Sequence, residues 1–221
     1  MRILFQGDSI TDADRDRSNP HDLGKGYPLY AAKFIKEEHP ETEFEFIDLG
    51  ISGNQTKDLV ARLESDFIAI NPDIVSIHIG VNDTWHHAES RDWLDNSLFE
   101  AQYRRVLSEI KEKTHARILI IEQFLLPVED KAYFRADLNG KIDITRALAR
   151  EFADYYIPLD GIMAKAAVDK GAYHWSDDGV HPNKNGAEFI GRIYADAISE
   201  MLGEEGGKYE NNKKYSQLYF Y

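Results

Sequence analysis

The sequence predicts an α/β fold in which helices cover both faces of a five-stranded parallel β-sheet. Five short apolar runs, rich in β-branched and aromatic residues, alternate with segments in which apolar residues recur at helical spacing. Several runs are nearly continuous in apolar character, which is typical of strands buried on both faces of a parallel sheet. Alternating strands and helices form βαβ units, and such units join parallel strands.

Each element can be assigned in chain order. The predicted strands are RILF (2–5), FEFIDL (44–49), DIVSIHI (73–79), RILIIEQF (117–124) and YYIPLD (155–160). Three apolar stripes predict amphipathic helices, the third of them long and last in the chain. The stripes are Leu59, Leu63 and Phe67; Phe99, Tyr103, Val106 and Ile110; and Phe189, Ile190, Ile193, Tyr194, Ala197 and Met201.

The chain is expected to form one domain followed by a tail. No internal repeat and no linker rich in Gly, Pro or Ser divides the sequence, so we assign a single domain to residues 1–203. Residues 204–221 end in aromatic side chains, which a frayed chain end would expose to water. We therefore expect this tail to pack against its own domain or against a second copy in a homo-oligomer.

Composition excludes several classes of partner and chemistry. The formal net charge of −13, with no block of Lys or Arg, argues against nucleic acid and anionic membranes as partners. The absence of cysteine excludes disulfides, thiolate catalysis and cysteine-bound zinc. No apolar run approaches the roughly 20 residues that a membrane span requires. If Met1 is the natural start, the first strand leaves no room for a signal peptide, and we expect a cytoplasmic protein.

The segments that leave the predicted strands are the places to look for a site, because ligands bind beyond the carboxyl ends of parallel strands. The first three strands lead into GDS (7–9), GISGNQT (50–56) and GVND (80–83), and the fifth leads through a helix to WSDDGVHPN (175–183). Each segment alone could be an ordinary turn or helix cap. The fourth strand leads into EQFLLPVED (122–130), to which we assign no role.

Taken together, these segments carry the parts of a serine hydrolase. A serine hydroxyl is a weak nucleophile and needs an adjacent base, so Ser9 and His181 form a candidate pair. An acid must hold the other imidazole nitrogen in the correct tautomer. Asp177 and Asp178 are both close enough in sequence to do this, and their spacing from His181 does not decide between them.

Attack on a carbonyl also requires donors for the oxyanion that forms. The candidates are the backbone N–H groups of Ser9 and Gly53 and the side-chain amide of Asn82. Glycine suits such a position because no Cβ obstructs a ligand that approaches its backbone.

Four of these blocks resemble the signature blocks of the SGNH, or GDSL, hydrolases. They are GDSIT (7–11), GISGNQT (50–56), GVND (80–83) and DGVH (178–181), in the family's order. The resemblance implies a flavodoxin-like three-layer α/β/α sandwich and hydrolysis of esters through an acyl-enzyme, with no cofactor and no metal.

The same resemblance assigns a role to individual residues. Ser9 is the expected nucleophile, His181 the base and Asp178 the acid that orients it. Ser9, Gly53 and Asn82 are the expected oxyanion donors. We therefore predict a serine esterase.

The acyl group and the alcohol are less clearly indicated. Tyr27, Trp85 and Trp175 lie near the site blocks, where they either fill the core or offer a face on which a sugar ring stacks. Trp85 beside GVND is similar to what acetylxylan-esterase-like members of the family have. Asp8 is expected to fix the nucleophile loop, and it is also a candidate substrate contact. We predict removal of O-acetyl groups from small saccharides, because no segment offers an apolar surface for long acyl chains.

Three alternatives remain open. The protein could be a general short-chain esterase, a thioesterase or a lysophospholipase-type acylhydrolase. It could also be a non-catalytic carbohydrate-binding protein on the same fold, although the complete set of Ser9, Asp178 and His181 argues against this. A metal site would have to be built from residues that lack ligand spacing. These are His78, Asp83, His86, His87 and His181.

Overall fold

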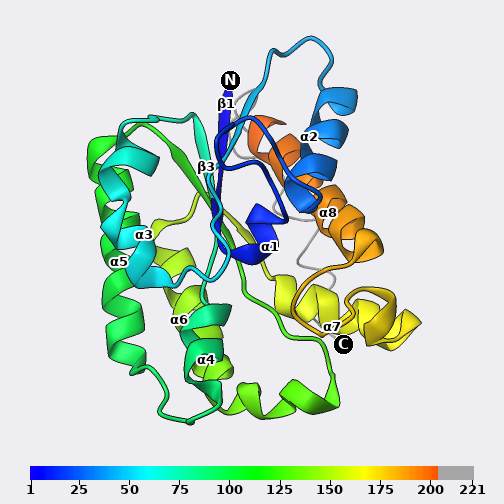
Figure 1. Cartoon of the computed structure of the whole chain (residues 1–221). Helices are drawn as coiled ribbons and strands as arrows, with labels where there is room; N and C mark the ends of the chain where they lie inside the picture. Colours follow the sequence, from blue (N-terminus) through cyan, green and yellow to red (C-terminus); the bar gives the residue numbers. More distant parts are fainter. Residues whose placement is uncertain (204–221) are drawn as a thin grey trace.

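A five-stranded parallel sheet with the order β2-β1-β3-β4-β5 forms the centre of the computed structural model, which describes residues 1–203 (Figure 1). Its strands are β1 (Arg2–Gly7), β2 (Glu45–Asp48), β3 (Ile74–His78), β4 (Arg117–Ile121) and β5 (Tyr155–Ile157). The predicted flavodoxin-like α/β sandwich is thereby confirmed. The chain moves from β1 to β2 on one side and then returns to place β3 on the other. The carboxyl ends of β1 and β3 are therefore the switch point at which such sheets bind ligands.

The fourth and fifth strands each end three residues earlier than the sequence predicts, and proline explains both differences. β5 ends at Ile157 because Pro158 has no N–H to continue the ladder. The run expected to extend to residue 124 ends as a strand at Ile121, which pairs with Ile157. Beyond that pair, no strand among residues 1–203 continues the ladder on this side of β4.

Helices form a layer on each side of the sheet. One layer contains α2 (Tyr27–Glu38), α7 (Leu159–Lys170) and α8 (Lys184–Gly203), and the other contains α3 (Thr56–Ala61), α5 (Asn96–Lys113) and α6 (Arg135–Phe152). Figure 1 shows α2 and α8 on the side opposite α3 and α5. Shorter helices lie near the strand ends: α1 (Ser9–Asp12), α4 (Val81–Ala88) and the 3₁₀ helices η2 (Glu129–Phe134) and η3 (Ala172–His174).

Alternating residues of the strands supply the two halves of the core. In β1, Ile3 and Phe5 face the layer of α2 and α8, whereas Leu4 faces the layer of α3 and α5. The Phe5 ring packs against the ring of Tyr194 at a centroid distance of 5.0 Å. Both half-cores are fully buried, so the sheet provides a rigid support for the loops at its carboxyl edge.

Two of the three predicted apolar stripes each lie on one α-helix, and the other is divided between two helical segments. The second and third coincide with α5 and α8. The first is divided, because α3 ends at Ala61 and a π-helical turn, Glu64–Ile68, follows. Phe67 of this wider turn is nevertheless 1% exposed, so the apolar stripe still reaches the core.

The tail assigned to residues 204–221 lies outside the described residues. Within residues 1–203, no helix combines the length and the apolar character needed to cross a membrane.

A buried ion pair within α6 anchors α4 through a hydrogen bond. The Lys141 ammonium is fully buried and donates to both carboxylate oxygens of Asp137 at 2.6 Å and to the Leu94 carbonyl at 3.1 Å. The Thr84 hydroxyl donates to the same carboxylate at 2.6 Å. These bonds fix α4, whose first turn carries Asn82.

Replacing Lys141 with Met is expected to lower the free energy of unfolding by about 3–5 kcal/mol, because the Asp137 carboxylate then stays buried without its cation. Lys111→Met is the control: this half-exposed lysine lies 3.6 Å from Asp154, and its loss should cost less than about 1 kcal/mol. Urea unfolding of both variants measures the difference. Equal losses would show that the buried pair has no special role in holding α4.

Candidate active site

The chain leaves β1 through a turn that only glycine fits. A Cβ on Gly7 would collide with the Thr11 hydroxyl and the His78 carbonyl oxygen. The next residue, Asp8, caps α1 by accepting a hydrogen bond from the N–H of Ile10 at 3.0 Å. Ser9 is therefore the first residue of α1, and its side chain lies at the carboxyl edge of the sheet.

Ser9, His181 and Asp178 form a continuous chain of hydrogen bonds. The Ser9 Oγ lies 2.8 Å from Nε2 of His181, and Nδ1 of His181 lies 2.8 Å from Oδ2 of Asp178. Because the carboxylate accepts from Nδ1–H, the neutral ring leaves Nε2 free to accept the Ser9 proton. Chemically, this arrangement can generate a serine nucleophile.

Backbone contacts hold Asp178 in place and distinguish it from its neighbour. Its Oδ1 accepts hydrogen bonds from the N–H groups of Val180 at 2.9 Å and His181 at 2.8 Å. The Asp177 carboxylate instead accepts from the Asn183 amide at 3.4 Å. Asp178, and not Asp177, thus contacts the imidazole.

Three ionisable groups of the site influence one another. Burial opposes ionisation of Asp178, but the hydrogen bonds from His181 and Val180 outweigh it and hold the pKa of this carboxyl well below its ordinary value. The bond to Asp178 raises the pKa of His181. Burial raises the pKa of Asp8 to about 7, although the Ile10 N–H and the charge of His181 counteract it.

The two other expected oxyanion donors lie on adjoining segments. Gly53 has φ +84°, a conformation that favours glycine, and no heavy atom lies within 4 Å of where a Cβ would be. The Asn82 amide nitrogen donates one hydrogen to the Asn54 carbonyl at 3.1 Å. Its second hydrogen is therefore available for another acceptor.

Reciprocal contacts fasten these two segments together. The Gln55 amide donates to the Asn82 carbonyl at 3.2 Å. The buried Asp83 carboxylate accepts from the Thr56 hydroxyl at 2.6 Å and from its N–H at 3.1 Å. The loop after β2 is thus held against the first turn of α4.

A further pair of contacts ties the same loop to the segment that follows Ser9. The Asp12 carboxylate accepts from the N–H and the hydroxyl of Ser52 at 2.8 and 2.9 Å. Arg15 donates to the Gly50 carbonyl at 3.0 Å. Sequence reasoning gave Asp12 and Arg15 no role, although a charged residue close to the GDSIT block was a usable signal, and it quoted Thr56 within a motif block without giving it a role.

Trp85 borders the imidazole. This half-buried residue of α4 has its ring centroid 5.6 Å from that of His181 and 5.6 Å from that of Phe134. The Lys131 ammonium of η2 lies 5.3 Å from the Trp85 ring centroid. The sequence does not reveal Lys131, because its contact with Trp85 arises only from tertiary packing.

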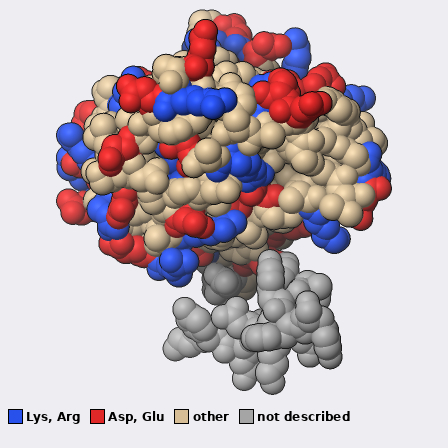
Figure 2. All heavy atoms as spheres, turned by 90° about the horizontal axis from the view of Figure 1, so that it is seen from below, with Lys and Arg blue, Asp and Glu red and all other residues tan. Residues whose placement is uncertain are grey.

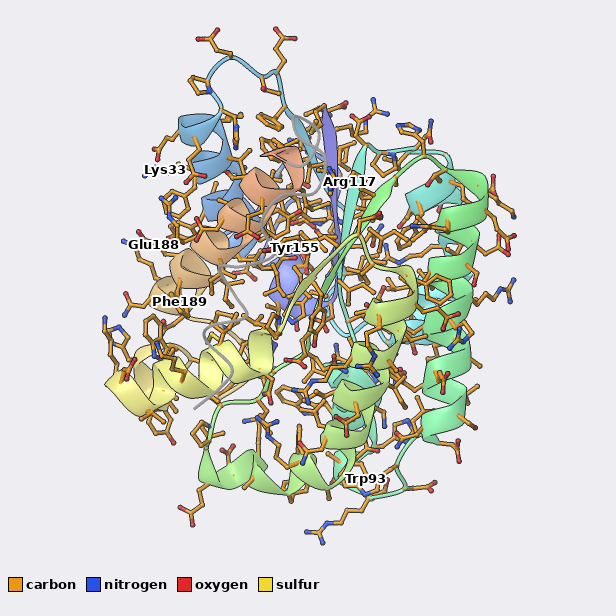
Figure 3. The ribbon with its side chains drawn as sticks, turned by 180° about the vertical axis from the view of Figure 1, so that it is seen from behind. Lys33, Trp93, Arg117, Tyr155, Glu188 and Phe189 are labelled. Carbon is orange, nitrogen blue, oxygen red and sulfur yellow. The ribbon has the colours of Figure 1, made fainter. Side chains whose placement is uncertain are left out.

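The other two aromatic candidates, Tyr27 and Trp175, lie in the core. Tyr27 is completely buried, with its hydroxyl 3.2 Å from that of Thr11. Trp175 is 7% exposed, donates to the Ala166 carbonyl at 2.9 Å and packs on Phe189 of α8, which Figure 3 shows beside α7. Both positions favour the packing alternative over a sugar-stacking face. The burial of Asp8 likewise favours its structural role.

Charges around the site are mixed. Figure 2, which views the molecule from the carboxyl-end side of the strands, shows acidic and basic side chains interspersed over this face. His78 is a buried residue of β3. Across residues 1–203, no group of three or more His, Cys, Asp or Glu side chains is arranged to hold a metal ion.

Known proteins share the sequence and the fold over most of the chain. The profile of the GDSL-like lipase/acylhydrolase family matches residues 5–189. An acetylxylan esterase from Geobacillus stearothermophilus is 30% identical over 205 residues, which cover 87% of this chain and 91% of that protein.

Solved structures agree with these matches. The crystal structure of a GDSL-like lipase from Parabacteroides merdae has a TM-score of 0.84 and 32% identity, covering 90% of this chain and 95% of that one. The Geobacillus acetylxylan esterase has a TM-score of 0.79 and 28% identity, covering 96% and 97%. Further structures of that esterase are catalytic mutants in which a serine, an aspartate or a histidine is replaced by alanine. The match over residues 5–189, together with a relative that is 30% identical over most of the chain, shows that this protein belongs to the GDSL-like lipase/acylhydrolase family.

Proposed function

We propose that this protein is a serine esterase in which Ser9, His181 and Asp178 form the catalytic triad. The observation that carries the proposal is the hydrogen-bonded chain from Ser9 Oγ to His181 Nε2 and from His181 Nδ1 to Asp178, with both distances 2.8 Å. This is the arrangement that a serine needs in order to act as a nucleophile near neutral pH.

The proposed reaction proceeds in two steps. As Ser9 Oγ attacks the ester carbonyl, His181 Nε2 takes its proton and then passes the proton to the leaving alcohol, so that an acyl-enzyme and a free alcohol result. Water then attacks the acyl-enzyme while His181 again serves as base, and the acid and free Ser9 are released. Asp178 remains ionised throughout and stabilises the imidazolium.

In both steps, the negative charge on the carbonyl oxygen requires donors that are already in position. We assign this role to the N–H groups of Ser9 and Gly53 and to the free hydrogen of the Asn82 amide. Two hydrogen bonds support the assignment. The bond from Asn82 to Asn54 fixes the Asn82 amide and leaves its second hydrogen free, and the bond from Thr56 to Asp83 fixes the loop that carries Gly53.

The Geobacillus esterase supports the assignment of the triad. Its catalytic mutants affect a serine, an aspartate and a histidine, and the aspartate and the histidine are three positions apart, as Asp178 and His181 are. That protein has a tryptophan directly before its aspartate, whereas this chain has Asp177. The surface beside the triad therefore differs between the two proteins.

For the substrate, we propose O-acetyl groups on small saccharides as a class rather than xylan in particular. The support is the name of the acetylxylan esterase relative and the position of Trp85, a half-buried aromatic ring beside His181. A sugar ring could pack on such a surface, while the acetyl group needs only a small pocket.

Ser9→Ala is expected to abolish nearly all hydrolysis of p-nitrophenyl acetate while the protein remains folded, because the nucleophile is lost. A serine-directed phosphonate should label Ser9 in the parent protein, as peptide mass spectrometry can verify. Ser90→Ala, a change at an exposed surface serine, is the control and should keep both activity and labelling. Full activity of the Ser9 variant would refute the mechanism.

The neighbouring acids offer a second test. Asp178→Asn should reduce kcat by about 10³- to 10⁴-fold, because an amide no longer enforces the tautomer in which Nε2 accepts a proton. Asp177→Asn, one position away, should change kcat less than about threefold. Steady-state kinetics of the two variants make the comparison, and equal losses would remove Asp178 from its proposed role.

Acyl-chain length and the sugar can be tested together. Activity on p-nitrophenyl esters should fall steeply from butyrate onward. Burial of each further CH₂ would contribute about 0.8 kcal/mol of binding free energy, and we expect the site to offer no apolar surface for it. Trp85→Ala should raise KM for an acetylated saccharide more than for p-nitrophenyl acetate, with Trp93→Ala, between α4 and α5, as control.

Other results of these assays would favour the alternative functions. Octanoate cleaved as fast as acetate would favour a general esterase, a thioesterase or a lysophospholipase-type acylhydrolase. Binding of saccharides without turnover of any ester would favour a non-catalytic carbohydrate-binding protein.

A further inference from the structure

Lys131, on η2, is a cation held close to the imidazole of His181. Its ammonium lies 5.3 Å from the centroid of the Trp85 ring, and the Trp85 ring lies 5.6 Å from that of His181. A cation near an aromatic face is attracted by the ring quadrupole, more strongly where water is excluded. The Lys131 side chain is 12% exposed, so most of it is withdrawn from solvent.

The partners of Lys131 keep it there. Asp130 accepts from its ammonium at 2.9 Å, but this carboxylate is 70% exposed and water screens much of its charge. Trp85 is in turn braced by Phe134, the last residue of η2, at 5.6 Å. The short helix η2 thus carries both Lys131 and Phe134, the ring that packs against Trp85.

The charges that face His181 come from several elements. Asp178, in the same loop, favours the imidazolium most strongly, and the buried Asp8, between β1 and α1, favours it when ionised, while Lys131 opposes it. Ser9, on α1, contributes a neutral hydroxyl. Two carboxylates without an opposing charge would favour the protonated ring, which cannot accept the Ser9 proton.

We propose that Lys131 is a positioning residue that keeps the His181 imidazole in its neutral, proton-accepting form, by placing a positive charge beside it across the Trp85 ring. Its catalytic consequence rests on the proposed esterase function, but its effect on the imidazole does not. Asp178 fixes the tautomer and also favours the imidazolium, whereas Lys131 opposes protonation of the ring.

The direct test is an NMR titration of the His181 imidazole in the intact protein, with His181→Asn identifying its resonance. Lys131→Met keeps the aliphatic chain on Trp85 and removes the charge, so the pKa of His181 should rise by roughly half a unit to one unit. Lys131→Arg, which retains a cation, should titrate like the parent. Lys33→Met, an equal change in net charge on the exposed side of α2 (Figure 3), should cause no shift.

Lys131→Gln gives a second neutral variant in case the methionine variant folds poorly. An unshifted His181 in a folded neutral variant would overturn the proposal, as would an equal shift in Lys33→Met. Because the titration needs no substrate, it gives an answer even if the protein hydrolyses none of the proposed esters.

In the esterase assay, the acid limb of the kcat/KM profile should move to higher pH by the same amount in the neutral variants. Activity below that limb should therefore fall by roughly three- to tenfold, while activity at alkaline pH changes little. A higher KM for acetylated saccharide with an unmoved limb would instead identify Lys131 as a substrate contact and would overturn the positioning role.

Discussion

The site depends on the pairing of β1 with a parallel strand on each side. Phe5 of β1 lies opposite Asp48 of β2, and Gly7 lies opposite His78 of β3, so the three strands deliver their exits to one edge. The three connections that begin there carry Ser9, Gly53 and Asn82. The order β2-β1-β3 thereby brings the three connections to one edge, and each contributes one of these residues.

Aspartate side chains hold the loops at this edge of the sheet in place. In each loop a side-chain carboxylate accepts from backbone N–H groups that a turn would otherwise leave unsatisfied. The pairs are Asp8 with Ile10, Asp12 with Ser52, Asp48 with Gly50, Asp83 with Thr56, and Asp178 with Val180 and His181. Several of the chain's aspartates therefore have a structural use at this edge.

The sequence predicted the fold and the motif blocks well, because both depend on local patterns. Apolar runs and helical stripes reveal strands and helices without knowledge of what they contact. Spacing alone does not choose between Asp177 and Asp178; the resemblance to the family favoured Asp178, and the structure places this carboxylate against the imidazole, with Val180 N–H bonded to its Oδ1.

A different cause explains why the sequence did not show that Tyr27 and Trp175 are buried or that Lys131 lies near the site. Whether Tyr27 or Trp175 faces the substrate or the core depends on the elements that cover it, such as α8. Lys131 lies near His181 only because η2 folds back over Trp85, a contact between residues 46 positions apart (131 − 85). Such relations arise from tertiary packing, which a motif cannot express.

The hydrogen bond between Ser9 and His181 joins residues 172 positions apart. A contact of such long range carries a loop-closure cost that local contacts do not, so it belongs to the late events of folding. During synthesis, Ser9 leaves the ribosome long before His181, so the hydrogen bond between them can form only after the segment before α8 has been made. Any reactivity that this bond gives to Ser9 therefore belongs to the folded chain and not to the nascent one.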